Sequence, residues 1–223
     1  MKKTLLFTII MTFFSQLLVA QIESWNIQGY TPPEEIEILD NLEEAKDFQK
    51  GDLIFSKAKG VFSISPINTI NNRALRKLKS EASIKGASHL YINYRNIENS
   101  VFSKTSMYSA TIYKENNLNI SDISKSIDGK KLLLKMEKTY SRNSWKMNYN
   151  DLNEIINFNL DEPLEERNGK IFINIRNKDE SFKKEKYEGV VEYEIIALEG
   201  NKLLIFKGNK SGTSNTLLGL EIQ

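Results

Sequence analysis

The chain has 223 residues, 40% of them hydrophobic and 27% charged, and a formal net charge of +2. It is too apolar for wholesale disorder and suits one large or two small globular domains, of which we favour two. Because it contains no cysteine, a disulfide framework and a thiolate metal site are excluded. The fold therefore has to be held together by packing alone.

Residues 1–20 have the features of a secretory signal peptide. Lys2 and Lys3 precede an apolar run, and Ala20 before Gln21 supplies the small residue that cleavage requires. Cleavage there would reduce the 31 basic residues to 29, equal to the 29 acidic ones. We therefore predict a periplasmic or secreted protein of zero net charge. It would have no stable membrane anchor after cleavage and no electrostatic footprint for nucleic acid.

Residues 21–66 predict an extended lead-in followed by two strands. The Pro32-Pro33 pair argues against a helix at the start. Residues 35–52 predict a strand and then a polar turn or short helical segment. Residues 53–66, with Gly60 and Pro66 as breaks, predict a second strand that leads into a loop, and Gly60 is expected to lie in a loose part of it. The side chains that could cap the next helix are Thr69, Asn71 and Asn72.

The best-specified stretch is residues 71–94, which predicts a helix, a glycine stop and a core strand. The apolar positions at helical spacing are Ala74, Leu75, Leu78 and Ala82. Gly86 follows them where a left-handed cap is needed, and a Schellman arrangement would bring Ala87 against Ala82. Since a β-carbon is penalised in that conformation, we expect Gly86→Val to cost more stability than Gly60→Val.

The residues after this cap predict two antiparallel strands. The first strand contains Leu90, Tyr91, Ile92 and Tyr94. Alternation over residues 107–113 predicts the second, paired with the first.

The segment ALRKLKSEASIKGASHLYI resembles the helix-to-strand signature A-x-x-x-L-x-x-E-A-x-x-x-G-A-x-x-hydrophobic of small bacterial βα domains. Examples are the YbjQ-like proteins and the envelope stress sensor RcsF. The resemblance covers residues 53–114 and implies a compact domain with a helix packed on a small sheet. YbjQ-like proteins carry a heavy-metal label and RcsF-like proteins depend on disulfides. Neither feature transfers to a chain without cysteine.

The second half of the chain predicts a linker followed by short β-strands. Residues 116–129, rich in Asn, Ser and Asp, predict a linker. From residue 130, short apolar runs separated by Asn168-Gly169 and Gly200-Asn201 predict an antiparallel sheet or a small barrel, loosely similar to the late hairpins of lipocalin-like domains. The predicted fold class is α+β. Its parts are a signal peptide (1–20), a βα domain (21–115), the linker (116–129) and a β-rich domain (130–223).

Aromatic residues of the second half leave two interpretations open. They could line a ligand cavity if the sheet closes into a barrel, or they could fill the core. They include Trp145, Tyr149, Phe158, Phe172, Tyr187, Tyr193 and Phe206.

Four features of the sequence are candidate chemical sites. The only histidine, His89, has no nucleophile beside it in the sequence and no further imidazole or thiolate ligands, which favours a packed or surface strand histidine. The acidic residues Asp161, Glu162, Glu165 and Glu166 lack EF-hand spacing and are interpreted as a solvated loop.

The other two features are a lysine cluster and a glycine-rich segment. Acidic neighbours interleave the lysines and favour a solvated hairpin edge, and the glycine-rich segment lacks the Gly-Lys-Ser/Thr ending of a P-loop. The lysines are Lys183, Lys184 and Lys186, and the segment contains Gly208, Ser211, Gly212, Thr213, Ser214 and Gly219.

The sequence therefore names no catalytic, cofactor-binding or metal-binding residue. We expect an exported, non-catalytic envelope protein that acts by binding a protein or a small molecule. The alternative is a carboxylate-dependent hydrolase, which two facing acids in a deep cleft would favour.

Overall fold

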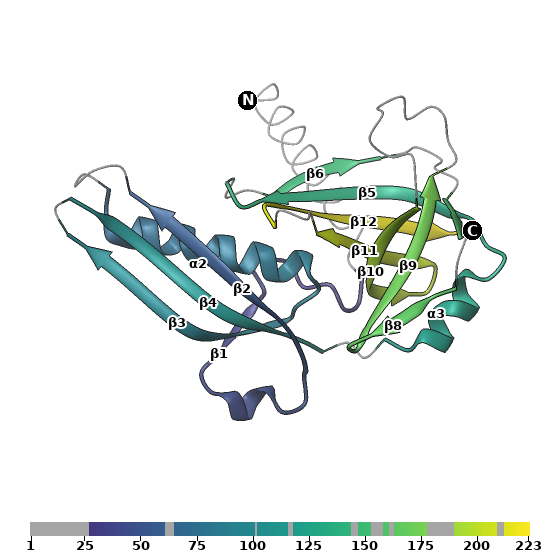
Figure 1. Cartoon of the computed structure of the whole chain (residues 1–223), viewed down its shortest axis with the longest axis horizontal. Helices are drawn as coiled ribbons and strands as arrows, with labels where there is room; N and C mark the ends of the chain where they lie inside the picture. Colours follow the sequence, from purple (N-terminus) through teal and green to yellow (C-terminus); the bar gives the residue numbers. More distant parts are fainter. Residues whose placement is uncertain are drawn as a thin grey trace, which may run out of the picture.

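The computed structural model describes residues 27–60, 65–100, 102–115, 118–143, 147–152, 158–160, 163–177, 190–208 and 212–223 (Figure 1). A small mixed sheet with one long helix comes first, and a larger antiparallel sheet follows. The predicted α+β class is confirmed. Within the described residues, no helix is long and apolar enough to cross a membrane.

The first part, called the sheet module, consists of one four-stranded sheet and the helix packed on it. Its strands run in the order β1-β3-β4-β2, with β1 parallel to β3 and the other neighbours antiparallel. Its elements are β1 Glu37–Leu39, a short 3₁₀ helix Leu42–Ala45, β2 Gln49–Lys59, α2 Ile67–Ile84, β3 His89–Asn99 and β4 Lys104–Lys114. The strands predicted over this part are confirmed.

Helix α2 buries the stripe that its sequence predicts. Ala74, Leu78 and Ala82 are fully buried against the sheet, and Leu75 is packed at the edge of the same cluster. The glycine cap is also confirmed. Gly86 has φ +75° and donates its N–H to the Ser83 carbonyl at 2.9 Å, while the Ala87 N–H reaches the Ala82 carbonyl at 3.0 Å. This pair of bonds is the Schellman pattern.

The predicted start of α2 is wrong. The helix begins at Ile67, with Pro66 as an N-cap residue that makes no side-chain capping bond. Asn71, expected as a cap, lies inside the helix, and its Oδ1 accepts hydrogen bonds from the hydroxyls of Ser106 and Tyr108 on β4. Proline fixes φ near the helical value and lacks an N–H, so it can begin a helix without a capping side chain.

The loose loop predicted at Gly60 is also wrong. A β-carbon on Gly60 would lie 2.4 Å from Ile70 Cδ1. Gly60 is therefore packed against α2, and a substitution there has to displace the end of the Ile70 side chain, which the sequence does not reveal.

The second part, called the barrel module, is antiparallel throughout. Its sheet runs β10-β11-β12-β5-β7-β9-β8, β6 pairs with β5, and an additional pairing of β10 with β9 closes the path into a ring. The sheet or small barrel left open by the sequence is therefore a barrel. Its elements are α3 Ile120–Ile127, β5 Leu132–Ser141, β6 Met147–Asp151, β7 Phe158–Leu160, β8 Glu165–Arg167, β9 Lys170–Asn177, β10 Val190–Glu199, β11 Lys202–Gly208 and β12 Ser214–Ile222.

Both predicted turns of the barrel module join neighbouring strands. Asn168 and Gly169, with φ of 54° and 71°, connect β8 to β9. Gly200 and Asn201 connect β10 to β11, where Glu199 faces Lys202. Positive φ at both central residues is the requirement of a type I′ hairpin turn, which explains the Asn-Gly pair.

The stretch predicted as a linker, residues 116–129, contains helix α3. The Asn119 side chain accepts the Ser121 N–H at 2.8 Å, and Ile123 and Ile127 are buried in the barrel core. A helix of 8 residues gives too few turns for its periodicity to stand out among Asn, Ser and Asp.

Aliphatic side chains fill the barrel interior, so among the described residues the core interpretation of the aromatics is favoured. Of the residues named for a cavity, Tyr193 belongs to this interior cluster, whereas Phe206 belongs to a cluster on the outside. Phe172 is half-buried and Tyr149 is 42% exposed. The positions of Trp145 and Tyr187 and the side chain of Phe158 lie outside the described residues.

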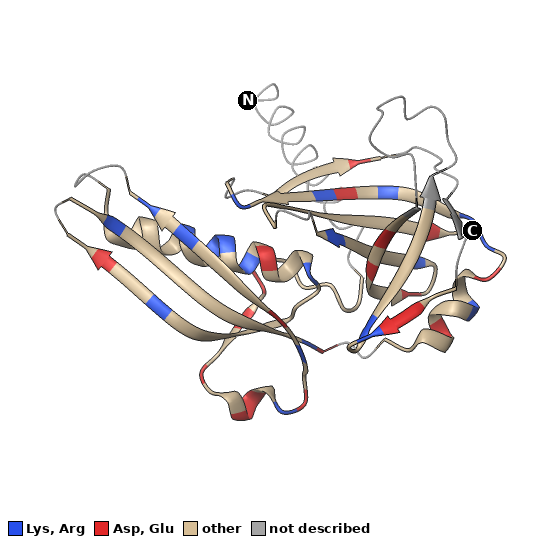
Figure 2. Ribbon diagram, viewed as in Figure 1, with Lys and Arg blue, Asp and Glu red and all other residues tan. Residues whose placement is uncertain are grey.

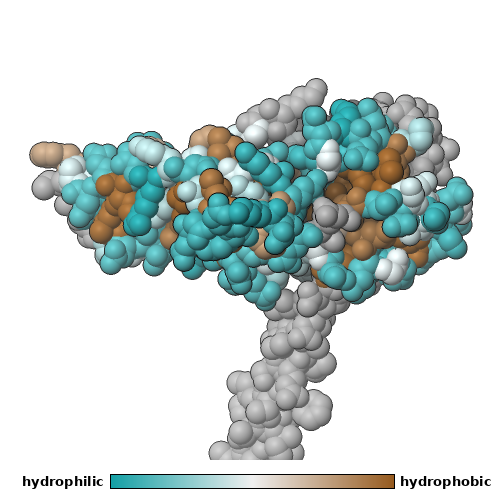
Figure 3. Space-filling view, turned by 90° about the horizontal axis from the view of Figure 1, so that it is seen from below, coloured by the Kyte–Doolittle hydropathy of each residue, from teal (hydrophilic) through white to brown (hydrophobic). Residues whose placement is uncertain are grey.

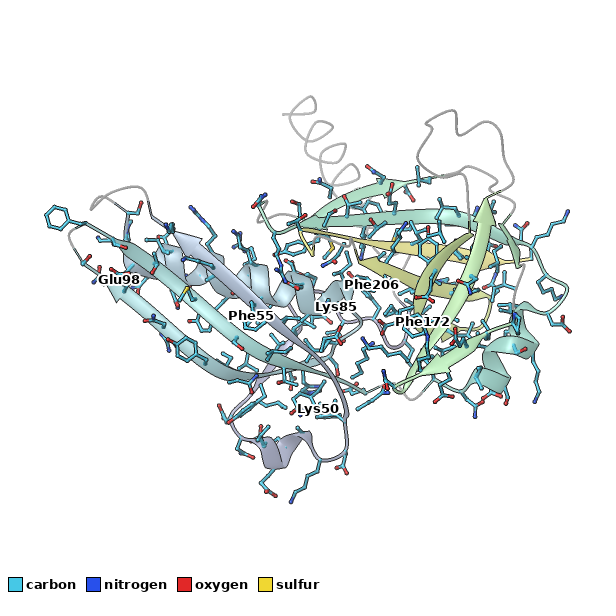
Figure 4. All side chains as sticks on the ribbon, in the orientation of Figure 1. Lys50, Phe55, Lys85, Glu98, Phe172 and Phe206 are labelled. Carbon is cyan, nitrogen blue, oxygen red and sulfur yellow. The ribbon has the colours of Figure 1, made fainter. Side chains whose placement is uncertain are left out.

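The two modules meet where the C-terminal end of α2 packs on the outer wall of the barrel (Figure 1). Ile84 at this end is fully buried in one cluster with Ile196, Phe206 and Leu217 of the barrel. Figure 4 shows Phe206 and Lys85 close to this junction.

Candidate functional site

His89 lies in a packed environment at the start of β3. Its residue exposure is 8%, and its ring stacks on Phe48 with 4.2 Å between ring centroids. Its Nδ1 is 2.8 Å from the Ser88 hydroxyl, and Glu37 Oε2 is 3.4 Å from its Nε2. These contacts are those of a packed strand histidine. Among the described residues, no His, Asp and Glu side chains form a group of three that could hold a metal ion.

The remaining sequence candidates are not brought together. Glu165 and Glu166 are exposed on β8, Gly208 ends β11, and Gly219 lies within β12. The candidates outside the described residues are Asp161, Glu162, Lys183, Lys184, Lys186 and Ser211.

A groove of about 790 Å³ runs along β2 and is here called the β2 groove. It is lined by side chains of the sheet module and by the end of β5 from the barrel module. The lining residues are Phe55, Ser56, Lys57, Lys59, Lys77, Tyr94, Met107, Tyr108, Ser109, Tyr140, Arg142 and Asn143.

Alternation along β2 places the groove's exposed side chains on one face. Ile54, Ser56 and Ala58 are buried on the side that faces α2, while Phe55, Lys57 and Lys59 are exposed on the opposite side. No helix covers this outer face in the region around Phe55 (Figures 1 and 4). The groove therefore includes the open face of the sheet and continues around the edge strand β2 to Lys77 on α2.

A β-bulge brings an aromatic side chain from β3 to the same face. The register passes from Ile92 opposite Ala110 to Tyr94 opposite Ser109, so Asn93 is the extra residue. Tyr94 thereby leaves the face of Leu90 and Ile92 and is 53% exposed. Because residues on one face repeat every second position, a single inserted residue moves all later side chains to the other face.

Cationic side chains dominate the charge of the groove. Lys57 and Lys59 are exposed and make no ion pair with a described residue. Lys77 Nζ donates to the Lys57 carbonyl at 3.2 Å, and burial together with the charge of Arg73 lowers the pKa of Lys77. Among the described residues that line the groove there is no carboxylate. Figure 2 shows further Lys and Arg residues along α2.

A buried acid lies directly behind one of these cations. Glu81 is 2% exposed, its Oε1 accepts from Arg142 Nη2 at 3.1 Å, and its Oε2 has no hydrogen-bond partner among the described residues. Burial and the Glu81 charge raise the pKa of Tyr140, whose hydroxyl donates to the Lys77 carbonyl at 3.0 Å. Glu81 thus orients Arg142 at the barrel end of the groove.

Ser56 supplies a polar atom without a partner in the groove. The residue is 8% exposed, it lines the groove, and its hydroxyl makes no hydrogen bond with a described residue. A buried hydroxyl without a partner is costly. This oxygen is inaccessible and lies on the side of β2 that faces α2, so it offers no contact to a ligand on the open face.

A second polar site lies at the junction between the modules. Asp52 accepts from Lys170 at 2.8 Å and from Lys85 at 3.3 Å, while Glu194 pairs with Lys114 at 2.8 Å and with Lys170 at 3.4 Å. Burial opposes the charge of Asp52, but the hydrogen bond from Lys170 and the charges of both lysines outweigh it and lower its pKa. Burial likewise opposes the charge of Lys170, and its partners outweigh it and raise its pKa.

This junction network has cavities on both sides. One, of about 250 Å³, is lined by Lys114, Glu166 and Glu194 among others, and the other, of about 400 Å³, by Lys50, Asp52 and Arg167 among others. The network links β2, the end of α2 and β4 to β9 and β10, and so joins the two modules.

Sequence reasoning missed the β2 groove. The alternation of Leu53, Phe55, Lys57 and Lys59 was a usable signal, because large apolar and basic side chains share one face of a single strand. The contribution of Tyr94 could not be found in this way, since it depends on the bulge. No protein-family model, no curated protein and no solved structure matches the chain.

Proposed function

We propose that the protein is an exported, non-catalytic binding protein whose ligand is anionic and lies in the β2 groove. One observation carries this proposal: four cationic side chains line the groove, and only Arg142 among them is paired with a carboxylate, that of the buried Glu81. The other three are Lys57, Lys59 and Lys77. A concave site of this size with convergent polar groups and aromatic walls has the usual make-up of a ligand site.

The rest of the molecule supports binding more than catalysis. The barrel interior is filled by aliphatic side chains, and the groove is open on the face of a sheet. A chain of zero net charge after signal cleavage has no long-range field for a polyanion, so an anionic ligand must be recognised by local contacts.

Export is part of the same proposal and rests on residues 1–20, which lie outside the described residues. Mature protein from a native host should begin at Gln21. Intact-mass analysis that found an unprocessed Met1 terminus in a membrane fraction would contradict it.

Binding can be tested with tripolyphosphate as a small anionic probe, titrated calorimetrically at low and at high salt. The double variant Lys57→Glu/Lys59→Glu should weaken binding at least tenfold, because charge-assisted hydrogen bonds contribute roughly 1.5–3 kcal/mol. The matched control is Lys125→Glu/Lys130→Glu, which reverses two exposed charges near α3. Equal loss in both double variants would mean that the probe responds only to overall charge.

A carboxylate-dependent hydrolase is the second candidate, because Glu166 and Glu194 line the same cavity of about 250 Å³. Glu194, however, is paired with Lys114 and Lys170. Both of its carboxylate oxygens are held by these ion pairs, so it is poorly placed to contact a substrate. Release of product from any glycoside substrate that is abolished by Glu194→Gln and Glu166→Gln, but not by the Lys57/Lys59 variant, would favour the hydrolase.

A further inference from the structure

We infer that the anionic ligand of the β2 groove is an acidic saccharide, a sugar chain that carries carboxylates. This inference rests on the proposed function and names the chemistry of its ligand. It depends on how the aromatic, hydroxyl and cationic side chains are arranged along the open face of the sheet.

Two half-exposed aromatic side chains flank β4 on the open face, and the space between them is here called the slot. Phe55 on β2 and Tyr94 on β3 both lie opposite Ser109, and they are 52% and 53% exposed. Since neighbouring strands are about 4.8 Å apart, the two backbones are separated by about 9.6 Å. The small Ser109 between them forms the floor. A ligand ring placed between these two side chains would contact aromatic carbon on both sides.

Two aromatic side chains with a hydroxyl between them suit a pyranose ring. The C–H faces of a pyranose match aromatic rings. Its hydroxyl edge can reach the hydroxyl of Ser109, which lies between Phe55 and Tyr94 in the register of the sheet.

The cations continue from the slot along the same face of β2. Lys57 and Lys59 follow Phe55 at two and four residues, which places their backbones about 7 and 14 Å farther along the strand. Lys57 lies opposite Met107, and Lys59 lies opposite Thr105. A sugar ring in the slot would thus have its own carboxylate, or that of the next ring, beside one lysine. A linear acidic saccharide satisfies both parts of the groove.

The inference can be tested with four probes of matched length or charge: tetragalacturonate, neutral galactotetraose, tetraglutamate and ADP. Tetragalacturonate should bind most tightly. Tyr94→Ala should raise its dissociation constant about tenfold, since it removes one of the two aromatic contacts to the sugar ring. Phe55→Ala should have a similar effect, and Tyr94→Trp should retain binding.

The control is Phe102→Ala, which removes an aromatic ring that is 97% exposed and does not line the groove. Its affinity should equal that of the parent. Because Phe55 and Tyr94 are half-exposed, their variants should fold, which circular dichroism checks.

Each other outcome has a distinct meaning. Tighter binding of ADP would overturn the saccharide in favour of a nucleotide. Equal binding of tetraglutamate, unaffected by Tyr94→Ala, would overturn it in favour of an acidic peptide. In both cases the proposed anionic function stands, provided that Lys57→Glu/Lys59→Glu weakens binding. If no anionic probe binds, tripolyphosphate included, the proposed function and this inference both fail.

Discussion

At the residue scale, Gly86 meets two separate requirements. Its φ of +75° is one that residues with a β-carbon rarely adopt, and a β-carbon there would lie 2.4 Å from Ile196 Cγ2 on the barrel. The first requirement belongs to the helix cap and the second to the contact between the modules. Local spacing predicts the first, whereas the second depends on tertiary structure.

Gly86→Ala should therefore cost more than a left-handed glycine usually does. We expect roughly 1 kcal/mol for the conformation and about 1–3 kcal/mol more for displacing Ile196. The matched control is Gly129→Ala. Gly129 has φ +65°, but no atom lies within 4 Å of its would-be β-carbon. Urea unfolding curves for the two variants give the comparison. Equal losses of stability would mean that Ile196 moves freely and that the module contact is loose.

At the scale of elements, the junction network makes stability depend on pH. Asp52 has a lowered pKa, so the stability from its ionised form is complete above its unfolded value of 3.8 and is lost as the pH falls through the lower folded value. Lys170 has a raised pKa, so its contribution is complete below 10.5 and is lost as the pH rises through the higher folded value.

Asp52→Asn should flatten the acid side of the stability curve, because Lys85 and Lys170 would lose the partner whose ionisation responds to acid. Lys170→Met should flatten the alkaline side, but it also leaves Asp52 and Glu194 with fewer partners. Melting temperatures across the pH range check both variants. A curve for Asp52→Asn that runs parallel to the parent between about pH 5 and pH 2 would contradict the role given to Asp52.

Features that depend on residues close together in the sequence could be predicted, whereas features that depend on how distant strands pair could not. The stripe of α2, its glycine cap and the Asn168-Gly169 turn follow from neighbouring residues, and all three predictions are confirmed. The position of Tyr94 could not be predicted from neighbouring residues. It continues the alternation of Leu90 and Ile92 in the sequence, yet the bulge at Asn93 moves it to the opposite face. The contribution of Tyr94 to the β2 groove requires that register shift, and no local sequence pattern predicts the shift.

At the scale of the whole molecule, the two modules share a hydrophobic junction. Seen from below, hydrophobic residues gather mainly over the barrel module and occur in smaller patches on the sheet module (Figure 3). The junction itself is buried: Ile84 from α2 is 0% exposed and is packed with Ile196, Phe206 and Leu217. Apolar contact of this kind, combined with the ion pairs around Asp52 and Lys170, should make the modules unfold together.

Ile84→Ala tests this coupling. Truncation of a fully buried isoleucine costs about 2–5 kcal/mol, and here the cavity would open between the modules. We expect two separate unfolding transitions in place of one, seen when urea unfolding is followed by far-ultraviolet circular dichroism and by hydrogen exchange. Ile54→Ala is the control, because Ile54 is also fully buried but packs inside the sheet module. That variant should lose similar stability and keep a single transition, since the contact between the modules is intact. If Ile84→Ala also unfolds in one step, the ion pairs alone are sufficient to hold the modules together.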